Sequence, residues 1–249
     1  MELVAENLVE RRFSRARMSY DHSALAQRSI AESLVEMLPL CSVESVLEIG
    51  CGTGFLTKAL LQKRTPSVLH LNDISSGFDS AFCDLQGFQD FRCICGDAEK
   101  YPWPRQYDWV LSSSAIQWFS DFRTFVPRIA HYINDGGLLA FSTFGQKNMQ
   151  EIRAVEGVGL DYFTQEDLEK CLMSNFRTLE CREETIELTF DSPHQVLRHL
   201  RDTGVNALVS ELWTPSRLRR FESTYEQLFS KDGKVTLTYH PIYYVGRKI

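Results

Sequence analysis

The sequence Val46-Leu47-Glu48-Ile49-Gly50-Cys51-Gly52-Thr53-Gly54 decides the fold, because an apolar run there carries an acidic residue and ends in three alternating glycines. Apolar residues in close succession are typical of a strand that is buried on both faces. Alternating glycines let the backbone turn sharply and approach a ligand closely, since no Cβ stands in the way. The stretch therefore predicts a strand at residues 45–49, followed by a loop that binds a flat, polar ligand.

The spacing of these glycines distinguishes between ligands. A dinucleotide-binding loop needs its third glycine three residues after the second, and Phe55 occupies that position. A P-loop would end in Gly-Lys-Ser or Gly-Lys-Thr, which does not follow here. The remaining pattern, acidic-x-Gly-x-Gly-x-Gly, resembles the first motif of class I S-adenosylmethionine (SAM) dependent methyltransferases. This resemblance implies that the cofactor's amino-acid end is bound by Glu48, Gly50, Cys51, Gly52 and Gly54.

Composition limits the class of protein. A chain of 249 residues with 43% hydrophobic and 24% charged residues fits one globular domain, residues 1–249, with a sizeable core. No apolar run approaches the roughly 20 residues of a membrane span, and the N-terminus lacks the features of a signal peptide, so we expect a cytoplasmic protein that binds no membrane. Seven cysteines without Cys-x-x-Cys spacing predict neither disulfides nor a metal site. A net charge of −6 argues against nucleic acid as the main partner.

Apolar runs alternate with amphipathic segments downstream of the glycine loop, which is typical of an α/β fold with a doubly wound, mostly parallel sheet. A strand at 178–190 and a last strand at 235–245 complete the sheet, and helices at 193–203 and 215–229 are inserted between them. The earlier strands are expected at 45–49, 68–71, 91–95, 109–112 and, after a Gly136-Gly137 turn, 138–143, with helices at 53–64 and 122–132.

Polar residues follow the second, third and fourth predicted strands, where ligands of doubly wound sheets bind. We expect Asp73, beside Ile74, to accept hydrogen bonds from both ribose hydroxyls. Asp97, beside Ala98, suits an acceptor for the adenine amino group. Both aspartates match the SAM methyltransferase pattern, although a helix cap and a turn residue are the alternatives. Ser113 completes the predicted cofactor site.

The segment after the fourth strand, residues 112–119, narrows the class of acceptor. It contains neither the Asn/Asp-Pro-Pro-aromatic motif of enzymes that methylate base amino groups nor the Pro-Cys of those that methylate cytosine carbon. We therefore expect a small or carrier-bound acceptor.

Five further blocks extend the resemblance over almost the whole chain. They are similar to the malonyl-acyl carrier protein O-methyltransferases of biotin synthesis, and they stand in the same order. A departure lies at 74–87, where the family usually has a helix and this chain has Ser-Ser-Gly-Phe-Asp-Ser. The blocks are Phe13-Ser14-Arg15-Ala16-x-x-x-Tyr20-Asp21, Ala115-Ile116-Gln117-Trp118, Phe141-Ser142-Thr143-Phe144, residues 200–207 (Leu-Arg-Asp-Thr-Gly-Val-Asn-Ala) and Leu237-Thr238-Tyr239-His240.

The resemblance implies a SAM-dependent carboxyl O-methyltransferase with a Rossmann-like class I sheet and an antiparallel last strand. An N-terminal helical cover (1–40), a cofactor-binding core (41–145) and a helical lid insertion (191–232) would form the single domain. Methyl transfer to the free carboxylate of a malonyl thioester, on acyl carrier protein or coenzyme A, would give the methyl ester primer of pimeloyl and biotin synthesis. Since that carboxylate is ionised near pH 7, no strong general base is required.

Two residues are predicted to handle the acceptor. Tyr20, in the N-terminal cover, is expected to orient the carboxylate or the reacting methyl group, and its alternative is a buried structural tyrosine. Arg153, in the helix after the fifth strand, is expected to hold one carboxylate oxygen and leave the other free to attack. A solvated helix arginine is the alternative for Arg153.

Arginines gather in the inserted helices of an otherwise acidic chain. Acyl carrier proteins are acidic, so these arginines predict a docking surface, with solvated helix faces as the alternative. Three other functions remain open: a SAM methyltransferase of another small carboxylic acid or metabolite, a non-catalytic SAM-binding partner, and a Rossmann oxidoreductase. The arginines are Arg198, Arg201, Arg217, Arg219 and Arg220.

Overall fold

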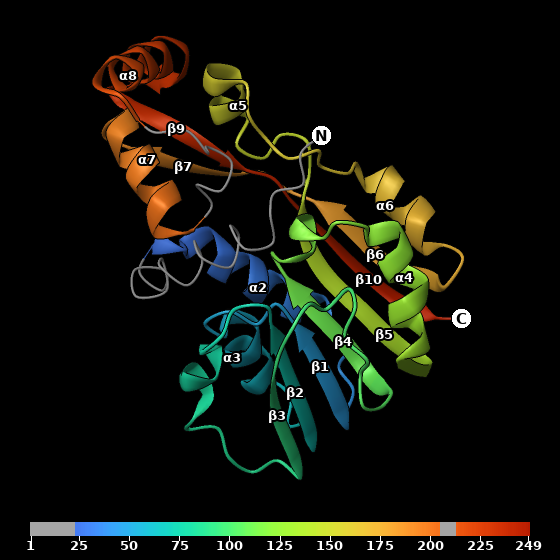
Figure 1. The fold of residues 1–249 in the computed structure, drawn as a ribbon. Coiled ribbons are helices and arrows are strands. Elements are labelled where there is room, and N and C mark those ends of the chain that lie inside the picture. The colour runs from blue at the N-terminus through green and yellow to red at the C-terminus, as the bar shows by residue number, and fades with distance from the viewer. Residues whose placement is uncertain (1–22, 205–212) are drawn as a thin grey trace. The chain divides into compact units, whose positions relative to one another are not determined.

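The computed structural model describes residues 23–204 and 213–249 (Figure 1). Tyr20, the N-terminal block that contains it and the residues from 205 onward in the 200–207 block lie outside the described residues. Within the described ranges, no helix combines the length and the apolar character that a bilayer crossing needs. The chain divides into two compact units. The core unit comprises Ala26–Thr143, Phe163–Glu183 and Ile242–Ile249, and the insertion unit comprises residues 23–25, Phe144–Tyr162 and the described residues of Glu184–Pro241.

The core unit contains a seven-stranded sheet in the order β3-β2-β1-β4-β5-β10-β6 (Figure 1). β1 pairs in parallel with both β2 and β4, so the strand order reverses between β1 and β4, while β10 runs antiparallel to β6. The predicted doubly wound, mostly parallel sheet is confirmed. Its strands are β1 (Ser45–Ile49), β2 (Val68–Asp73), β3 (Asp90–Cys95), β4 (Tyr107–Ser113), β5 (Ile133–Phe144), β6 (Phe176–Glu183) and β10 (Pro241–Lys248).

The helices of the core unit bury apolar faces against this sheet. In α4, the Asp121 side chain accepts a hydrogen bond from the Thr124 amide at 3.0 Å, which caps the first turn. Phe125 and Ile129, one helical turn apart, are then buried in the main apolar cluster with residues of β4 and β5. The elements are α2 (Leu25–Met37), α3 (Phe55–Leu61), α4 (Phe122–His131), α6 (Gln165–Leu172) and the short 3-10 helices η1 (Phe78–Phe82) and η2 (Ile116–Trp118).

The insertion unit contains a three-stranded antiparallel sheet in the order β7-β9-β8. Both inserted helices begin as their sequence predicts, with a hydroxyl side chain as the N-cap and a proline in the first turn. The buried Phe221 and Tyr225 lie one turn apart on α8. The elements are α5 (Gln150–Glu156), α7 (Pro193–Asp202), α8 (Pro215–Phe229), β7 (Ile186–Phe190), β8 (Ser230–Lys231) and β9 (Lys234–Tyr239).

Two predicted strands were wrong in their extent, because the chain changes sheet within each of them. The strand expected at 178–190 is split into β6 and β7, and the strand expected at 235–245 is split into β9 and β10 at His240 and Pro241. Proline has no N–H to donate to a ladder, which suits the first position of a strand. At 178–190 the apolar positions change phase across the polar residues 182–185, from Leu179 and Cys181 to Ile186 and Leu188, whereas at 235–245 apolar residues continue past Pro241. Alternation specifies a face of a sheet but not the partner strand.

Two smaller predictions concern glycine-rich segments. The Gly136-Gly137 turn was wrong: both glycines lie inside β5, at an irregularity where the register with β4 moves from Tyr107 opposite Ile133 to Trp109 opposite Leu138. The interruption predicted for 74–87 is confirmed. This segment forms only the 3-10 helix η1, which buries Phe78 and Phe82.

Candidate cofactor and acceptor sites

The glycine loop follows β1 with all three glycines in the left-handed region, at φ 69° for Gly50, 52° for Gly52 and 87° for Gly54. A Cβ on Gly50 would lie 2.3 Å from the Ala115 side chain, and one on Gly54 would lie 2.5 Å from the Phe82 ring. A Cβ on Gly52 would meet no atom within 4 Å. Packing therefore requires glycine at the two outer positions, whereas Gly52 leaves open space beside the loop.

Glu48 lies beneath this loop, 1% exposed. The Thr57 hydroxyl of α3 donates a hydrogen bond to its Oε2 at 2.6 Å. Burial raises the pKa of Glu48 to about 8, because an ionised carboxylate loses its hydration there. Glu48 thus ties β1 to α3 through a side chain, Thr57, that sequence inspection did not single out.

Cys51 is buried in the loop and contributes its main chain rather than its thiol. Its amide donates to the Asn72 carbonyl at 2.9 Å, and burial raises the pKa of the thiol far above its ordinary range. The described residues include no group of three His, Cys, Asp or Glu side chains that could hold a metal ion, and all seven cysteines are free.

Asp73, the last residue of β2, holds the glycine loop directly. Its Oδ2 accepts a hydrogen bond from the Gly52 amide at 2.9 Å, and its Oδ1 accepts one from the Ser75 amide at 2.8 Å. Each carboxylate oxygen can accept a further hydrogen bond, so the contact with the loop leaves capacity for a ligand. Ile74 follows, and its carbonyl lies 3.7 Å from the Cys95 thiol.

Asp97 lies at the next strand end along the sheet. Its Oδ1 accepts a hydrogen bond from the Glu99 amide at 2.9 Å, as in the turn that was its alternative role, and the Lys100 ammonium lies 2.8 Å from Oδ2. The neighbouring Ala98 is buried. Asn72, which sequence inspection missed, donates to the carbonyls of Ile94 at 3.0 Å and Gly96 at 2.9 Å and so ties β2 to the end of β3.

The end of β4 brings a third polar group to the same edge of the sheet. Ser113 and Ser142 share a hydrogen bond of 3.0 Å between their hydroxyls, and the Ser114 amide donates to the Ser142 hydroxyl at 3.1 Å. Ser114 itself has φ 53°, an uncommon conformation for a residue other than glycine. Such local strain occurs often at ligand sites.

Three buried polar atoms at the ends of β1 and β4 have no hydrogen-bond partner among the described residues. They are Thr53 Oγ1, Ser114 Oγ and Gln117 Oε1. An unpaired buried polar atom costs about 1–3 kcal/mol, so each favours a ligand that supplies a partner. Together with the open side of Gly52, these atoms fit the polar cofactor that the sequence predicts.

Arg153 lies on α5 in the insertion unit. One terminal nitrogen, Nη2, donates to the Leu160 carbonyl at 3.0 Å, and the guanidinium carbon lies 5.6 Å from the centre of the Tyr162 ring. These contacts fix the direction of an exposed guanidinium group. Since arginine carries five N–H donors, several remain for a ligand.

A buried polar cluster fixes the start of α5 against β9. The Glu151 carboxylate accepts hydrogen bonds from the Thr238 amide at 3.0 Å and the Thr238 hydroxyl at 2.5 Å. Asn148 accepts from the His240 amide at 3.3 Å and donates to the Tyr162 hydroxyl at 2.9 Å. His240 Nδ1 in turn lies 3.3 Å from the Lys147 amide, so this histidine has structural contacts inside the insertion unit.

Comparison with known proteins identifies the family. Residues 47–141 match the family described as "Methyltransferase domain". A malonyl-[acyl-carrier protein] O-methyltransferase of Bacteroides helcogenes is 36% identical over 97% of this chain and 98% of its own. One of Chlorobium luteolum is 39% identical over 99% of this chain and 97% of its own. The chain belongs to the malonyl-[acyl-carrier protein] O-methyltransferase family. This finding confirms the predicted family and the prediction that the protein is a methyltransferase.

The fold of this family member agrees with a solved methyltransferase structure. The N-methyltransferase NodS of Bradyrhizobium japonicum, in complex with S-adenosyl-L-homocysteine, has a TM-score of 0.53 and 12% identity, covering 87% of this chain and 85% of that one. The comparison supports the predicted α/β methyltransferase fold.

The residues predicted for the site fall into three groups in this member of the O-methyltransferase family. Those predicted for the cofactor lie at the carboxyl ends of β1 to β4 in the core unit, and the structure links Asp73 to Gly52 directly. Arg153 belongs to the insertion unit. Tyr20 lies outside the described residues. The tertiary partners Thr57, Phe82 and Asn72 carry no sequence pattern of their own, whereas Thr53 and Ser114 lie within motifs that the sequence already shows.

Proposed function

We propose that this protein transfers the methyl group of SAM to the free carboxylate of a malonyl thioester, giving a methyl ester that primes pimeloyl and biotin synthesis. The observation that carries the proposal is the likeness, over nearly the full chain, to relatives named malonyl-[acyl-carrier protein] O-methyltransferase. That likeness includes the insertion unit, where acceptor specificity is expected to arise, as well as the cofactor-binding core.

SAM would be held at the β1/β4 edge of the core unit. When bound, it supplies a methyl group on a positively charged sulfur. The open side of Gly52 and the unpaired Thr53 Oγ1 and Ser114 Oγ support this site. The residues proposed to hold the cofactor are Glu48, Gly50, Cys51, Gly52, Gly54, Asp73, Ile74, Asp97, Ala98 and Ser113. Glu48 and Cys51 would act through the loop that they support, because neither side chain is exposed.

The acceptor needs orientation more than activation. A malonyl carboxylate is ionised near pH 7, so no residue has to remove a proton. Arg153 would hold one carboxylate oxygen, and its contacts with Leu160 and Tyr162 fix the direction of that bond. Tyr20 would orient the same group. Alignment of the free oxygen and exclusion of water then supply the rate enhancement.

An acidic carrier protein would dock on the arginines of α7 and α8. Arg201 lies 3.1 Å from Asp202, and Arg217 is paired with Glu156, so both are already neutralised. Arg198, Arg219 and Arg220 are exposed and have no ion-pair partner among the described residues. Charge complementarity at these three would speed and orient the encounter.

Mass spectrometry tests the proposed reaction. The protein is incubated with SAM and malonyl-acyl carrier protein or malonyl-coenzyme A, and the malonyl group is expected to gain one methyl. A panel of other small carboxylic acids separates the main alternative function. No added methyl on either malonyl thioester would refute the proposal.

Kinetics of Arg153→Ala test the acceptor site separately. Loss of a charge-assisted hydrogen bond is expected to raise the KM for the malonyl substrate by about tenfold or more, with little change in the KM for SAM. Equal changes in both constants would count against a role in holding the acceptor.

A further inference from the structure

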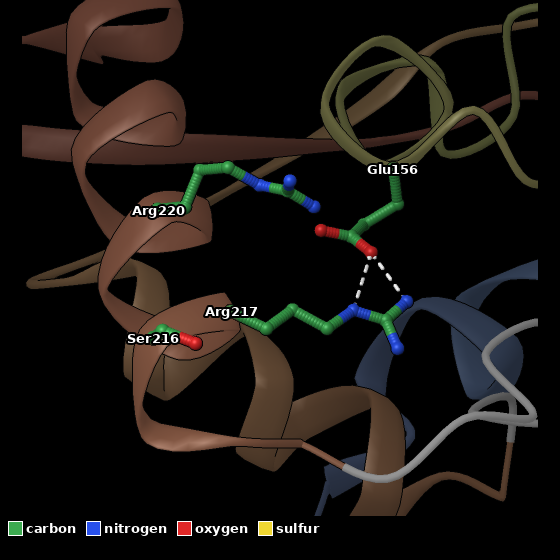
Figure 2. A pocket seen from close by; sticks show the side chains of 4 residues that line it. All are labelled: Glu156, Ser216, Arg217 and Arg220. Atoms are coloured by element: carbon green, nitrogen blue, oxygen red, sulfur yellow. Dashed lines mark hydrogen bonds and ion pairs between the residues drawn. The ribbon is translucent and has the colours of Figure 1, made fainter.

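A pocket of about 410 Å³ lies within the insertion unit, between the first turns of α8 and the end of α5. Glu156, Ser216, Arg217 and Arg220 line it. Figure 2 shows the Glu156 carboxylate and both guanidinium groups pointing into the same space.

Arg217 is held rigidly at one side of this pocket. Its Nε and Nη2 donate to the same oxygen, Oε2 of Glu156, at 3.0 and 2.6 Å (Figure 2). Its guanidinium carbon lies 4.9 Å from the centre of the Trp213 ring. The Glu156 side chain is 3% exposed. The pair therefore fixes both the carboxylate and the guanidinium group at the pocket wall.

The other groups in the pocket have hydrogen-bonding capacity left over. Glu156 Oε1 is buried and has no hydrogen-bond partner in the described structure. Arg220 is exposed, and no described residue forms an ion pair with it. The Ser216 hydroxyl, on the first turn of α8, lies 3.2 Å from the Thr214 hydroxyl and can bond further. Two guanidinium groups against one carboxylate leave the pocket with net positive charge.

This combination defines the chemistry of the ligand. Positive charge and the N-terminal end of a 15-residue helix favour an anion. A simple anion would be repelled by Glu156 and would leave Oε1 without a partner. A ligand that carries a phosphate and, a few bonds away, a hydroxyl donor satisfies both requirements, because the hydroxyl can donate to Oε1 while the phosphate meets arginine.

We infer that the pocket binds the pantetheine arm of the thioester substrate, through its phosphate and the hydroxyl that follows. Arg220 and Ser216 contact the phosphate oxygens, and Glu156 Oε1 accepts from the hydroxyl. The inference rests on the proposed function, since a malonyl thioester on a carrier protein or on coenzyme A brings this arm with it. It adds a specific binding site that serves either form of the substrate.

Isothermal titration calorimetry with two small probes tests the site on the full chain. The probes are 4′-phosphopantetheine and pantetheine, which differ only in the phosphate. Arg220→Gln is expected to raise the Kd of phosphopantetheine by about tenfold or more and to leave the Kd of pantetheine unchanged. Lys231→Gln, which removes one exposed positive charge elsewhere in the insertion unit, is the matched control and is expected to change neither Kd.

Several outcomes would overturn the inference. Equal affinity of the wild type for the two probes, equal effects of Arg220→Gln and Lys231→Gln, or no binding of phosphopantetheine at millimolar concentration would each do so. Inorganic phosphate binding as tightly as phosphopantetheine would also exclude the pantetheine arm. The readout is binding, so it is independent of the methyl-transfer assay: methylation without Arg220-dependent binding refutes the site alone, whereas binding without methylation refutes only the proposed reaction.

Discussion

Replacing Glu48 by glutamine should stabilise the protein relative to the wild type, and this difference in unfolding free energy should grow as pH rises. Glutamine keeps the size of the side chain and leaves the Thr57 hydroxyl an oxygen to bond, but it removes the ionisable carboxyl beneath the glycine loop. In the wild type, burial raises the pKa of Glu48 from 4.5 to about 8. Between pH 4.5 and 8, the folded protein therefore retains a proton on Glu48 that the unfolded chain has released.

The size of the effect follows from linkage. Below pH 4.5 the carboxyl is protonated in both states and the wild type carries no penalty. As pH rises from 4.5 to 8, the wild type loses about 1.4 kcal/mol of unfolding free energy per pH unit relative to the variant. The difference reaches about 5 kcal/mol by pH 8 and stays level above it.

Urea denaturation from pH 4.5 to 9 measures this difference, followed by tryptophan fluorescence, because Trp103 and Trp109 are buried in the core unit. Glu32→Gln, which removes an exposed carboxyl of α2, controls for the change in net charge. If the unfolding free energies of wild type and Glu48→Gln differ by the same amount at every pH, the buried carboxyl does not have a raised pKa.

Three further predictions concern other sites. Gly52→Ala should lower the unfolding free energy by about 1 kcal/mol and raise the Kd of SAM more than tenfold in calorimetry. Gly87→Ala, in a similarly open left-handed setting, should cost the same stability and leave the Kd of SAM unchanged; equal Kd values for the two variants would contradict this. Burial lowers the pKa of His199 from 6.5 to about 4. As pH falls from 6.5 to 4, the wild type should therefore lose about 3 kcal/mol of unfolding free energy relative to His199→Gln. Urea titrations that show the same difference in unfolding free energy at every pH would contradict the lowered pKa. Glu151→Ala should lower the unfolding free energy by about 3 kcal/mol, because it leaves two donors of Thr238 unpaired. In a double-mutant cycle with Thr238→Val, the two losses of unfolding free energy should be coupled, and additive losses would refute the pairing.

The residues at the carboxyl ends of the core strands were predictable, because each of them lies in a pattern that is local in sequence. Parallel strands buried on both faces appear as apolar runs, and the polar residues that meet a ligand come at or just after the strand ends, as Asp73 and Asp97 do. The three alternating glycines signal the loop in the same way. The resemblance to the family then predicted the acceptor of the methyl group, which the glycine loop alone could not predict.

What the sequence could not show depends on contacts between distant residues. The alternation at 178–190 changes phase at the polar residues 182–185, but nothing in it shows that the chain leaves one sheet and joins another at Glu184 and Thr185. Nor does any local pattern reveal that Phe82 packs on Gly54 or that Thr57 bonds Glu48. The pocket at Glu156 was equally hidden, because its residues come from two helices that are about sixty residues apart in the chain.

The insertion unit has a consequence for chimeras between relatives. Besides residues 23–25, its described part comes from two longer stretches, Phe144–Tyr162 and the described residues of Glu184–Pro241. Each stretch supplies one side of the Glu151–Thr238 and Glu156–Arg217 pairs, so a hybrid that exchanges only one of them joins partners from different parents. Acceptor preference should therefore transfer between family members only when both stretches are grafted together, and single-stretch hybrids should express poorly.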